Sequence, residues 1–281
     1  MSNFLKKILT NKLNDDEISS IYSSFDLIGD IAVIKIPETL EHKKNIIGKA
    51  ILDNIKIVKT VFGQISPVQG EFRLRKLELL AGENKTITYY KEHGCIFKVD
   101  VAKTYFSPRL STERQRISKQ IDNNNDIILN MFSGVGTFSI IIAKKNRSSI
   151  VYNIDSNPDA IELAIINAKL NKVENRVFSI IGDARKTVVQ EFVGKVNRVL
   201  MPLPELAKDF IDEAVESLIE KKGIIHYFAH VKSTNKRNAI NDGITDTKSA
   251  FHNYNHKIRE TRVVREVGPR IYQIVSDVLI I

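Results

Sequence analysis

The second part of the chain constrains the fold most, because short apolar runs alternate there with helical segments. The segment ILNMFSGVGTFSI, residues 128–140, is typical of a strand, a glycine turn and an apolar helix. This alternation predicts an α/β domain with a mostly parallel, doubly wound, Rossmann-like sheet. The other expected elements are strands at 149–154, 176–181, 198–201 and 223–229, helices at 157–168 and 205–220, and a closing hairpin at 258–281.

The first hundred residues follow a different pattern. Two short apolar runs surround Gly29, and a helix-like stretch covers residues 38–55. Strand-like runs then cluster from 57 to 101, with a hairpin turn near 92–94. We therefore expect two domains, a small α+β domain at residues 1–104 and a larger α/β domain at residues 105–281.

Composition limits the class of protein. The chain has 42 Lys and Arg against 33 Asp and Glu, a formal net charge of +9, which favours polyanions such as nucleic acid but also fits a lysine-rich composition. The sequence shows neither a signal-peptide core nor an apolar run long enough to span a membrane, so we expect a cytoplasmic protein without membrane contact. The single cysteine, Cys95, excludes a disulfide framework and a cysteine-based zinc site, and no metal is expected.

Three features at the ends of successive strands predict a nucleoside-cofactor site. Gly134 and Gly136 let the backbone approach a ligand before a helix N-terminus. Asp155 ends the second strand, where such folds place an acid that accepts both ribose hydroxyls, and Asp183 ends the third, where it can meet an adenine amino group. Each alone has a structural explanation, as a packing turn or a helix cap.

The spacing of this turn favours S-adenosylmethionine over a dinucleotide, because Ser139 stands where the dinucleotide pattern has a third glycine. The residues expected to bind the cofactor are Met131, Phe132, Gly134, Gly136, Asp155, Ser156, Asp183 and Ala184.

Several motifs together resemble the archaeal tRNA (guanine-37-N1)-methyltransferase family, from about residue 13 to the end of the chain. The resemblance implies a Rossmann-like class I methyltransferase domain, preceded by a small domain that helps to grip tRNA. It also implies methyl transfer from S-adenosylmethionine to guanosine 37, next to the anticodon, and we expect a monomer. The motifs are SFDLIGDIAVIKIP (24–37), GEFRLRKLELLAGENKT (70–86), VDVAKTYFSPRLSTERQRI (99–117), NMFSGVGTFSI (130–140), IDSNPDAIELAIINAKLN (154–171), GDAR (182–185) and KGIIHYF (222–228).

The resemblance also implies two catalytic residues. Glu113 matches the residue that takes the proton from guanine N1, and Arg73 matches an arginine that steadies the guanine oxygen. Guanine N1 becomes a good nucleophile only when a carboxylate removes its proton, and a guanidinium can stabilise the charge that builds on the neighbouring oxygen. Without the resemblance, Glu113 reads as the ion-pair partner of Arg109 or Arg116 on a solvated helix, and Arg73 as a strand-surface charge.

Three departures from the family pattern bear on the substrate. Pro202-Leu203-Pro204 stands where the family commonly has Asn-Leu-Pro, and proline offers neither a side-chain amide nor a backbone N–H. Within the family this variant marks a subgroup, some of whose members also methylate a tricyclic wyosine precursor at position 37. Asn130 replaces an acid before the glycine turn, and an extra N-terminal domain of longer members is expected to be absent. The residues expected to contact the substrate are Arg109, Arg114, Pro202, Leu203 and Pro204.

Other functions stay open. A transferase that moves the aminocarboxypropyl group of the cofactor onto the wyosine precursor shares this fold, so the fold cannot separate the two reactions. A tRNA-binding protein without catalysis is a different class, against which the glycine turn, Asp155, Glu113 and Arg73 argue. A small-molecule methyltransferase explains the sheet but neither the first domain nor the positive charge.

Overall fold

The structure is a computed structural model that describes residues 2–22, 24–66, 70, 72–121 and 125–281. The chain divides into two compact units, Met1–Pro108 and Arg109–Ile281. The domain boundary expected between residues 104 and 105 stays a prediction.

The first unit contains a mixed four-stranded sheet in the order β1-β2-β3-β4. Strands β2 and β3 are parallel, and the two outer pairs are antiparallel. The helical stretch expected at 38–55 consists of a 3-10 helix followed by an α-helix, and aliphatic side chains of these helices and of the sheet form the core of the unit. The elements are α1 (Ser2–Leu9), α2 (Asp15–Ser20), β1 (Asp26–Ile28), β2 (Ile31–Ile34), η1 (Glu38–Lys43), α3 (Lys44–Asn54), β3 (Thr60–Gln64) and β4 (Leu77–Gly82).

A separate hairpin completes the first unit. Its strands β5 (Ile87–Glu92) and β6 (Cys95–Asp100) pair antiparallel. His93 and Gly94 connect them with φ angles of 48° and 74°, the left-handed conformation that a tight two-residue hairpin turn requires at both positions. The turn expected near residues 92–94 is confirmed.

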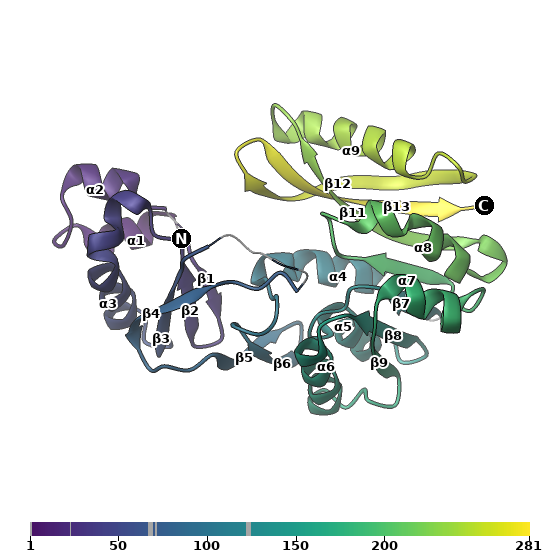
Figure 1. Ribbon diagram of the computed structural model, residues 1–281, viewed down its shortest axis with the longest axis horizontal. Helices are drawn as coiled ribbons and strands as arrows, with labels where there is room; N and C mark the ends of the chain where they lie inside the picture. Colours follow the sequence, from purple (N-terminus) through teal and green to yellow (C-terminus); the bar gives the residue numbers. More distant parts are fainter. Residues whose placement is uncertain (1, 23, 67–69, 71, 122–124) are drawn as a thin grey trace. The chain divides into compact units, whose positions relative to one another are not determined.

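The second unit is built on a seven-stranded sheet in the order β12-β13-β11-β10-β7-β8-β9 (Figure 1). Neighbours from β11 through β10, β7 and β8 to β9 are parallel, while β13 pairs antiparallel with both β11 and β12. The expected mostly parallel, Rossmann-like sheet is therefore confirmed. Its strands are β7 (Ile127–Asn130), β8 (Ile150–Asp155), β9 (Val177–Ile181), β10 (Arg198–Met201), β11 (Gly223–Lys232), β12 (His256–Gly268) and β13 (Ile271–Ile280).

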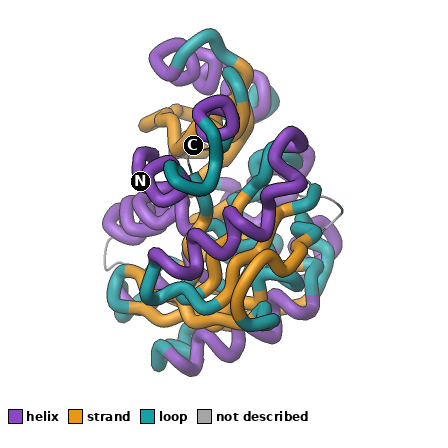
Figure 2. Tube along the Cα trace, turned by 90° about the vertical axis from the view of Figure 1, so that its left-hand side faces the viewer, coloured by secondary structure: helices purple, strands orange, loops and turns teal. Residues whose placement is uncertain are grey.

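Helices cover both faces of this sheet, and Figure 2 shows its strands between helices. Helices α4 (Ser111–Gln120), α5 (Thr137–Lys145) and α6 (Pro158–Leu170) lie on one face. Helices α7 (Ala184–Thr187), α8 (Ile211–Ser217) and α9 (Lys236–Ala250) lie on the other. The helix expected at 205–220 is shorter than predicted, because 3-10 helices η4 (Ala207–Phe210) and η5 (Ile219–Lys221) flank α8, and α9 was not expected.

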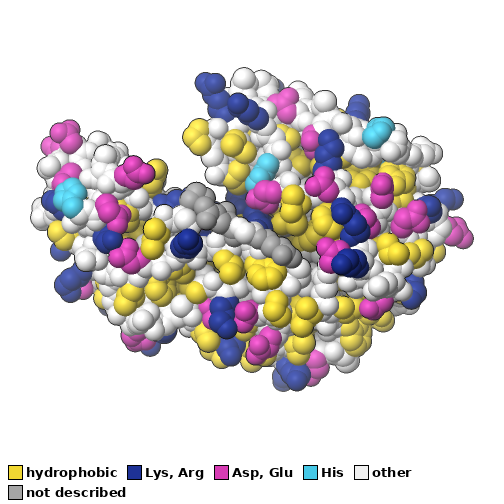
Figure 3. All heavy atoms as spheres, viewed as in Figure 1, with side chains coloured by type: hydrophobic (Ala, Val, Ile, Leu, Met, Phe, Trp, Pro, Cys, Tyr) yellow, Lys and Arg dark blue, Asp and Glu magenta, His cyan; other side chains and the backbone are white. Residues whose placement is uncertain are grey.

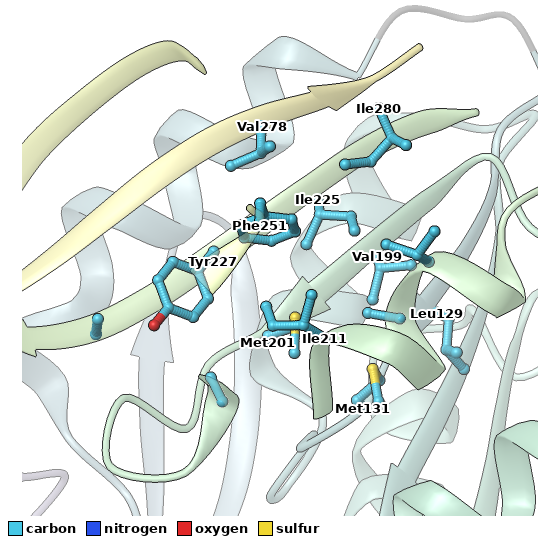
Figure 4. Close-up of a cluster of buried hydrophobic side chains, with 14 of the residues drawn as sticks. Leu129, Met131, Val199, Met201, Ile211, Ile225, Tyr227, Phe251, Val278 and Ile280 are labelled. Atoms are coloured by element: carbon cyan, nitrogen blue, oxygen red, sulfur yellow. The ribbon is translucent and has the colours of Figure 1, made fainter. Parts of the chain in front are cut away.

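The side chains of β11 show how the two faces differ. Tyr227 points toward α9, belongs to the buried cluster in Figure 4, and donates its hydroxyl to Asp246 at 3.0 Å. Phe228 packs against Phe138 of α5 on the opposite face. His226, which alternates with Tyr227 along the strand, therefore also faces α4 and α5.

Within the described part of the chain, none of the helices is long and apolar enough to cross a bilayer.

Candidate active site

The glycine turn follows the central strand β7, where the strand order reverses between β8 and β10. In open α/β sheets, ligands bind at the carboxyl ends of the strands at such a reversal. Gly134 and Gly136 have φ angles of 53° and 81°, and Gly136 is the N-cap of α5. A Cβ on Gly136 would lie 3.2 Å from side-chain carbons of Ala164 and Ile140, so the position needs glycine for space as well as for its backbone conformation.

Asp155 ends β8 and holds this turn. Its Oδ2 accepts the backbone N–H of Gly134 at 2.7 Å, and its Oδ1 accepts that of Asn157 at 3.0 Å. Burial raises the pKa of this carboxyl, while the two N–H groups act in the opposite direction. Each oxygen has a second lone pair with which to accept a ribose hydroxyl, so the arrangement fits the adenosyl part of S-adenosylmethionine.

The helix that follows Asp155 begins as the sequence predicts. Asn157 is the N-cap of α6, its side chain accepts the N–H of Asp159, and Pro158 occupies the first turn. Ser156, expected to bind the cofactor, lies between Asp155 and this cap and is half-buried.

Asp183 has the alternative role considered for it, because it caps α7 and accepts the N–H of Lys186 at 3.0 Å. Its side chain is exposed beyond the end of β9, which leaves it accessible to a ligand. The neighbouring Ala184 has its side chain in the buried core, so only its backbone can face a cofactor.

Two residues of the glycine turn have packing roles. Met131 is fully buried in the core cluster. Phe132 is half-buried and packs edge-on against Phe210, with ring centroids 5.0 Å apart. Phe132 therefore remains the better candidate of the two for contact with an adenine ring.

Buried polar side chains connect the base of the turn. Asn130 donates Nδ2–H to Ser139 Oγ at 3.1 Å, and the Ser139 hydroxyl donates to Asn153. Ser139, at the position of the missing third glycine, thus links α5 to β7 and β8.

Glu113 lies in the first turn of α4, and its side chain is only 2% exposed. Its Oε1 accepts the Nε–H of Arg116 at 2.7 Å, and its Oε2 lies 3.7 Å from Nε of Arg262. Burial raises the pKa of Glu113, and the Arg116 and Arg262 cations oppose that rise. The alternative interpretation of Glu113 expected an ion pair with Arg109 or Arg116 on a solvated helix. The pair with Arg116 is present, but the Glu113 carboxylate is buried. A buried carboxylate with a raised pKa is typical of a residue that accepts a proton.

Arg116 connects Glu113 to the sheet on the face that α4 covers. Its Nη1 and Nη2 donate to the two carboxylate oxygens of Asp277 on β13, at 2.5 and 3.0 Å. Asp277 also contacts His226 Nδ1 at 2.7 Å. The contact of Asp277 with Arg116 and His226 was not expected from the sequence, because no local pattern connects β11 and β13 with α4.

Arg73 lies in the first unit. Its φ angle is 54°, which a non-glycine residue adopts only uncommonly. Its guanidinium carbon lies 4.1 Å from the ring centroid of Tyr105, a cation–π arrangement. Arg73 is therefore a turn residue stacked on an aromatic ring, not a charge on a strand surface, and Tyr105 is a neighbour that the sequence analysis did not identify.

The two arginines expected to contact the substrate differ in exposure. Arg109 is exposed in the short 3-10 helix η2 (Pro108–Leu110) that leads into α4. Arg114 is only 2% exposed, with its guanidinium carbon 5.9 Å from the ring centroid of Phe138. Arg109 therefore stays the better candidate for a phosphate contact.

The Pro-Leu-Pro segment directly follows β10. Pro202 and Leu203 are half-buried, and Pro204 is buried. The Leu203 N–H donates to the carbonyl of Met201 at 2.9 Å, so it is already used within the turn.

The surface charges in Figure 3 are mixed. On the face shown, Lys and Arg side chains are interspersed with Asp and Glu rather than gathered in one patch. No group of three or more His, Cys, Asp or Glu side chains is placed to hold a metal ion among the residues that the structure describes.

Comparison with known proteins identifies relatives along nearly the whole chain. The model of the TRM5/TYW2 methyltransferase domain matches residues 88–259, and that of the TYW2 N-terminal domain matches residues 5–86. The sequence is 40% identical over 274 residues to the tRNA (guanine(37)-N(1))-methyltransferase Trm5b of Methanocaldococcus jannaschii, covering 97% of this chain and 76% of that protein.

Two further relatives extend the comparison. The sequence is 34% identical to the tRNA 4-demethylwyosine(37)-methyltransferase Taw21 of Saccharolobus solfataricus, covering 97% of this chain and 98% of that protein. The solved complex of aTrm5 and tRNALeu matches the structure with a TM-score of 0.83 at 38% identity, covering 99% of this chain and 78% of that chain.

Proposed function

Because the chain belongs to the TRM5/TYW2 methyltransferase family, we propose that it transfers the methyl group of S-adenosylmethionine to N1 of guanosine 37 in tRNA. The family membership expected from the sequence motifs is confirmed. The observation that carries the proposal is Glu113, a buried carboxylate in the same unit as the glycine turn, with a pKa raised by burial.

The residues have distinct tasks in this reaction. S-adenosylmethionine supplies a methyl group activated by its sulfonium sulfur. Asp155 accepts the ribose hydroxyls, and its hydrogen bond from the Gly134 N–H keeps the glycine turn in place beside the cofactor. Glu113 accepts the N1 proton as N1 forms its bond to the methyl carbon, while the bond from that carbon to the sulfonium sulfur breaks and S-adenosylhomocysteine leaves. Arg73 keeps its expected role of steadying the guanine oxygen. Holding the base and the methyl group in line supplies a further part of the rate.

A second candidate substrate is 4-demethylwyosine at the same position. Two observations favour it. The match to Taw21 covers 98% of that protein, and Pro202 stands where a side-chain amide for guanine is expected. The chemistry is again methyl transfer, so the two substrates compete for one site.

The test is transfer from S-adenosylmethionine to three tRNAs, with guanosine, adenosine or 4-demethylwyosine at position 37. The cofactor carries its label either in the methyl or in the carboxyl group, and mass spectrometry identifies the modified nucleoside. We expect methyl label in 1-methylguanosine only with guanosine 37. Carboxyl label in the product means aminocarboxypropyl transfer, and no label in any tRNA, with tRNA still bound, means a binding protein without catalysis.

The proposal includes a monomeric enzyme that acts in the cytoplasm. Light scattering of the purified protein tests the first point, and cell fractionation tests the second.

A further inference from the structure

We propose that Arg116, held in place by Asp277, is a positioning residue that binds Oε1 of Glu113 and leaves Oε2 to take the substrate proton. This role rests on the proposed function of Glu113 as the base. All three residues belong to the unit Arg109–Ile281.

The guanidinium of Arg116 contacts three carboxylates, those of Glu113, Asp277 and Glu260. Nη1 and Nη2 form a bidentate pair with Asp277 at 2.5 and 3.0 Å. On the adjoining edge, Nε donates to Glu113 Oε1 at 2.7 Å, and Nη2 lies 2.6 Å from the same oxygen. Arg116 is 13% exposed, and its planar fork fixes the direction of every bond. A lysine ammonium offers the same charge but cannot reproduce this geometry.

Asp277 is in turn fixed by three side chains from two elements, α4 and β11. Besides Arg116 of α4, it accepts Nε2–H of Gln120 at 2.8 Å and contacts Nδ1 of His226 on β11 at 2.7 Å. Burial works against the charge of Asp277, but the hydrogen bonds from His226 and Arg116 hold its pKa well below the usual range. Asp277 is therefore an anion that anchors Arg116.

His226 joins this cluster in its neutral form. Its Nε2 lies 3.0 Å from Nη1 of Arg198, which can only donate, so Nε2 accepts and the proton resides on Nδ1 facing Asp277. Burial lowers the pKa of His226, which agrees with a neutral ring. Arg198 is paired with Asp126 at 3.2 Å, which ends the chain of contacts.

The two oxygens of Glu113 are consequently not equivalent. Oε1 receives the hydrogen bond from Arg116, whereas Oε2 lies 3.7 Å from the nearest nitrogen of Arg262, beyond hydrogen-bond distance. Fixing one oxygen orients the carboxylate, and the second oxygen keeps its lone pairs for a proton.

The charges around Glu113 act in opposite directions. Within Arg109–Ile281, Arg116 on α4 and Arg262 on β12 favour its ionised form, while Asp277 on β13 disfavours it. The carboxylate of Glu260 on β12 lies 3.2 Å from Nη1 of Arg116, so it also balances part of the Arg116 charge. Asp277 therefore has two effects, since it holds Arg116 in place and limits how strongly Arg116 stabilises the Glu113 anion.

The experiment measures single-turnover methyl transfer against pH for Arg116→Gln, Arg116→Lys and Asp277→Asn. Loss of the Arg116 cation should move the acid limb of the rate profile to higher pH, because Glu113 then ionises less readily. Loss of the Asp277 charge should move it to lower pH. Arg116→Lys keeps the charge without the fork, so the limb should stay near that of the wild type while the plateau rate falls about 100-fold, as for a misplaced base.

Three controls accompany these variants. Asp246→Asn removes a matched carboxylate that accepts the Tyr227 hydroxyl on the opposite face of the same sheet, and it should leave rate and limb unchanged. Calorimetry should show unchanged S-adenosylmethionine affinity in every variant. Thermal melting identifies any variant that does not fold, and the two Arg116 variants carry the test if Asp277→Asn is lost.

The ionisation of Glu113 is also followed directly, by carbon NMR of glutamate labelled at the carboxyl group, with Glu113→Gln identifying the signal. Opposite movements of this titration in Arg116→Gln and Asp277→Asn support the proposal. Unchanged titrations, or movements in the same direction, overturn it. Wild-type protein that transfers no methyl group in any tRNA assay refutes the proposed function instead, and the NMR titration still decides whether Arg116 and Asp277 control Glu113.

Discussion

Replacing Asp155 by asparagine tests the cofactor site most sharply, because both carboxylate oxygens already accept backbone N–H groups. Oδ2 is bonded to Gly134 and Oδ1 to Asn157. Asparagine has the same shape but only one acceptor oxygen, and its NH2 group can only donate. Whichever way the amide turns, a donor therefore faces the N–H of Gly134 or that of Asn157.

The expected loss follows from the bonds removed. A hydrogen bond to a charged group contributes about 1.5–3 kcal/mol, and at least one is lost from the turn that the cofactor contacts. Since about 1.4 kcal/mol corresponds to a tenfold change in Kd, Asp155→Asn should weaken S-adenosylmethionine binding by about 10- to 150-fold. The free energy of unfolding should fall by less than the free energy of cofactor binding, because burial disfavours the ionised carboxylate and a neutral amide avoids that cost.

Calorimetric titration with S-adenosylmethionine measures this effect in the wild type, Asp155→Asn, Asp155→Ala and Glu162→Gln. Glu162 is an exposed acid on α6, the helix that follows Asp155 in the chain, so its variant removes an equal charge from a neighbouring element and should bind normally. Wild-type affinity in Asp155→Asn would refute the reasoning from the two N–H groups. Wild-type affinity in Asp155→Ala would show that the ribose binds elsewhere.

Three other outcomes are expected. Gly136→Ala should lower the free energy of unfolding in urea by about 2–5 kcal/mol, because alanine would have to adopt the left-handed backbone and its Cβ would meet side-chain carbons at 3.2 Å. Gly194 has a φ of 66° with open space around a Cβ, so Gly194→Ala should lower it by only about 1–2 kcal/mol. Equal losses in the two variants would contradict the crowding at Gly136. Glu113→Gln should slow methyl transfer by about 10²- to 10⁴-fold with cofactor affinity retained, and comparable turnover removes Glu113 from the role of base. His226 takes up a proton more readily in the unfolded chain than in the folded protein, because burial lowers its pKa in the fold. The free energy of unfolding should therefore fall as the pH drops below about 6.5, by at most about 1.4 kcal/mol per pH unit. If the free energy of unfolding of His226→Gln depends on pH in the same way between about pH 7 and 5, the loss belongs to other groups.

The sequence predicted the elements whose signals are local. The glycine turn, the strand before it and the cap at Asn157 depend on residues within a few positions of one another, and all three form as expected. Helix α9 was missed because its buried stripe consists of Ala239, Gly243 and Thr247, which have helical spacing but little apolar bulk.

The environment of the predicted base depends on contacts that local patterns do not contain. Arg116 and Asp277 are 161 positions apart, and only the insertion of β13 beside β11 brings them together beneath α4. Arg73 was predicted from the family resemblance, but its left-handed backbone and its stacking on Tyr105 depend on the fold of the turn.

Asp155 and Glu113 show how one fold can prepare two carboxylates for different tasks. Burial raises the pKa of both, so the difference lies in what opposes it. At Asp155 the opposing groups are backbone N–H dipoles, which keep their position whatever the cofactor does, and such a carboxylate is suited to remain an acceptor. At Glu113 the opposing groups are the Arg116 and Arg262 side chains, and the charge of Arg116, the closer of the two, is shared with Asp277. A carboxylate whose counter-charge is already balanced can gain a proton without leaving an unpaired buried cation, and this is the condition that a general base in a buried site must meet.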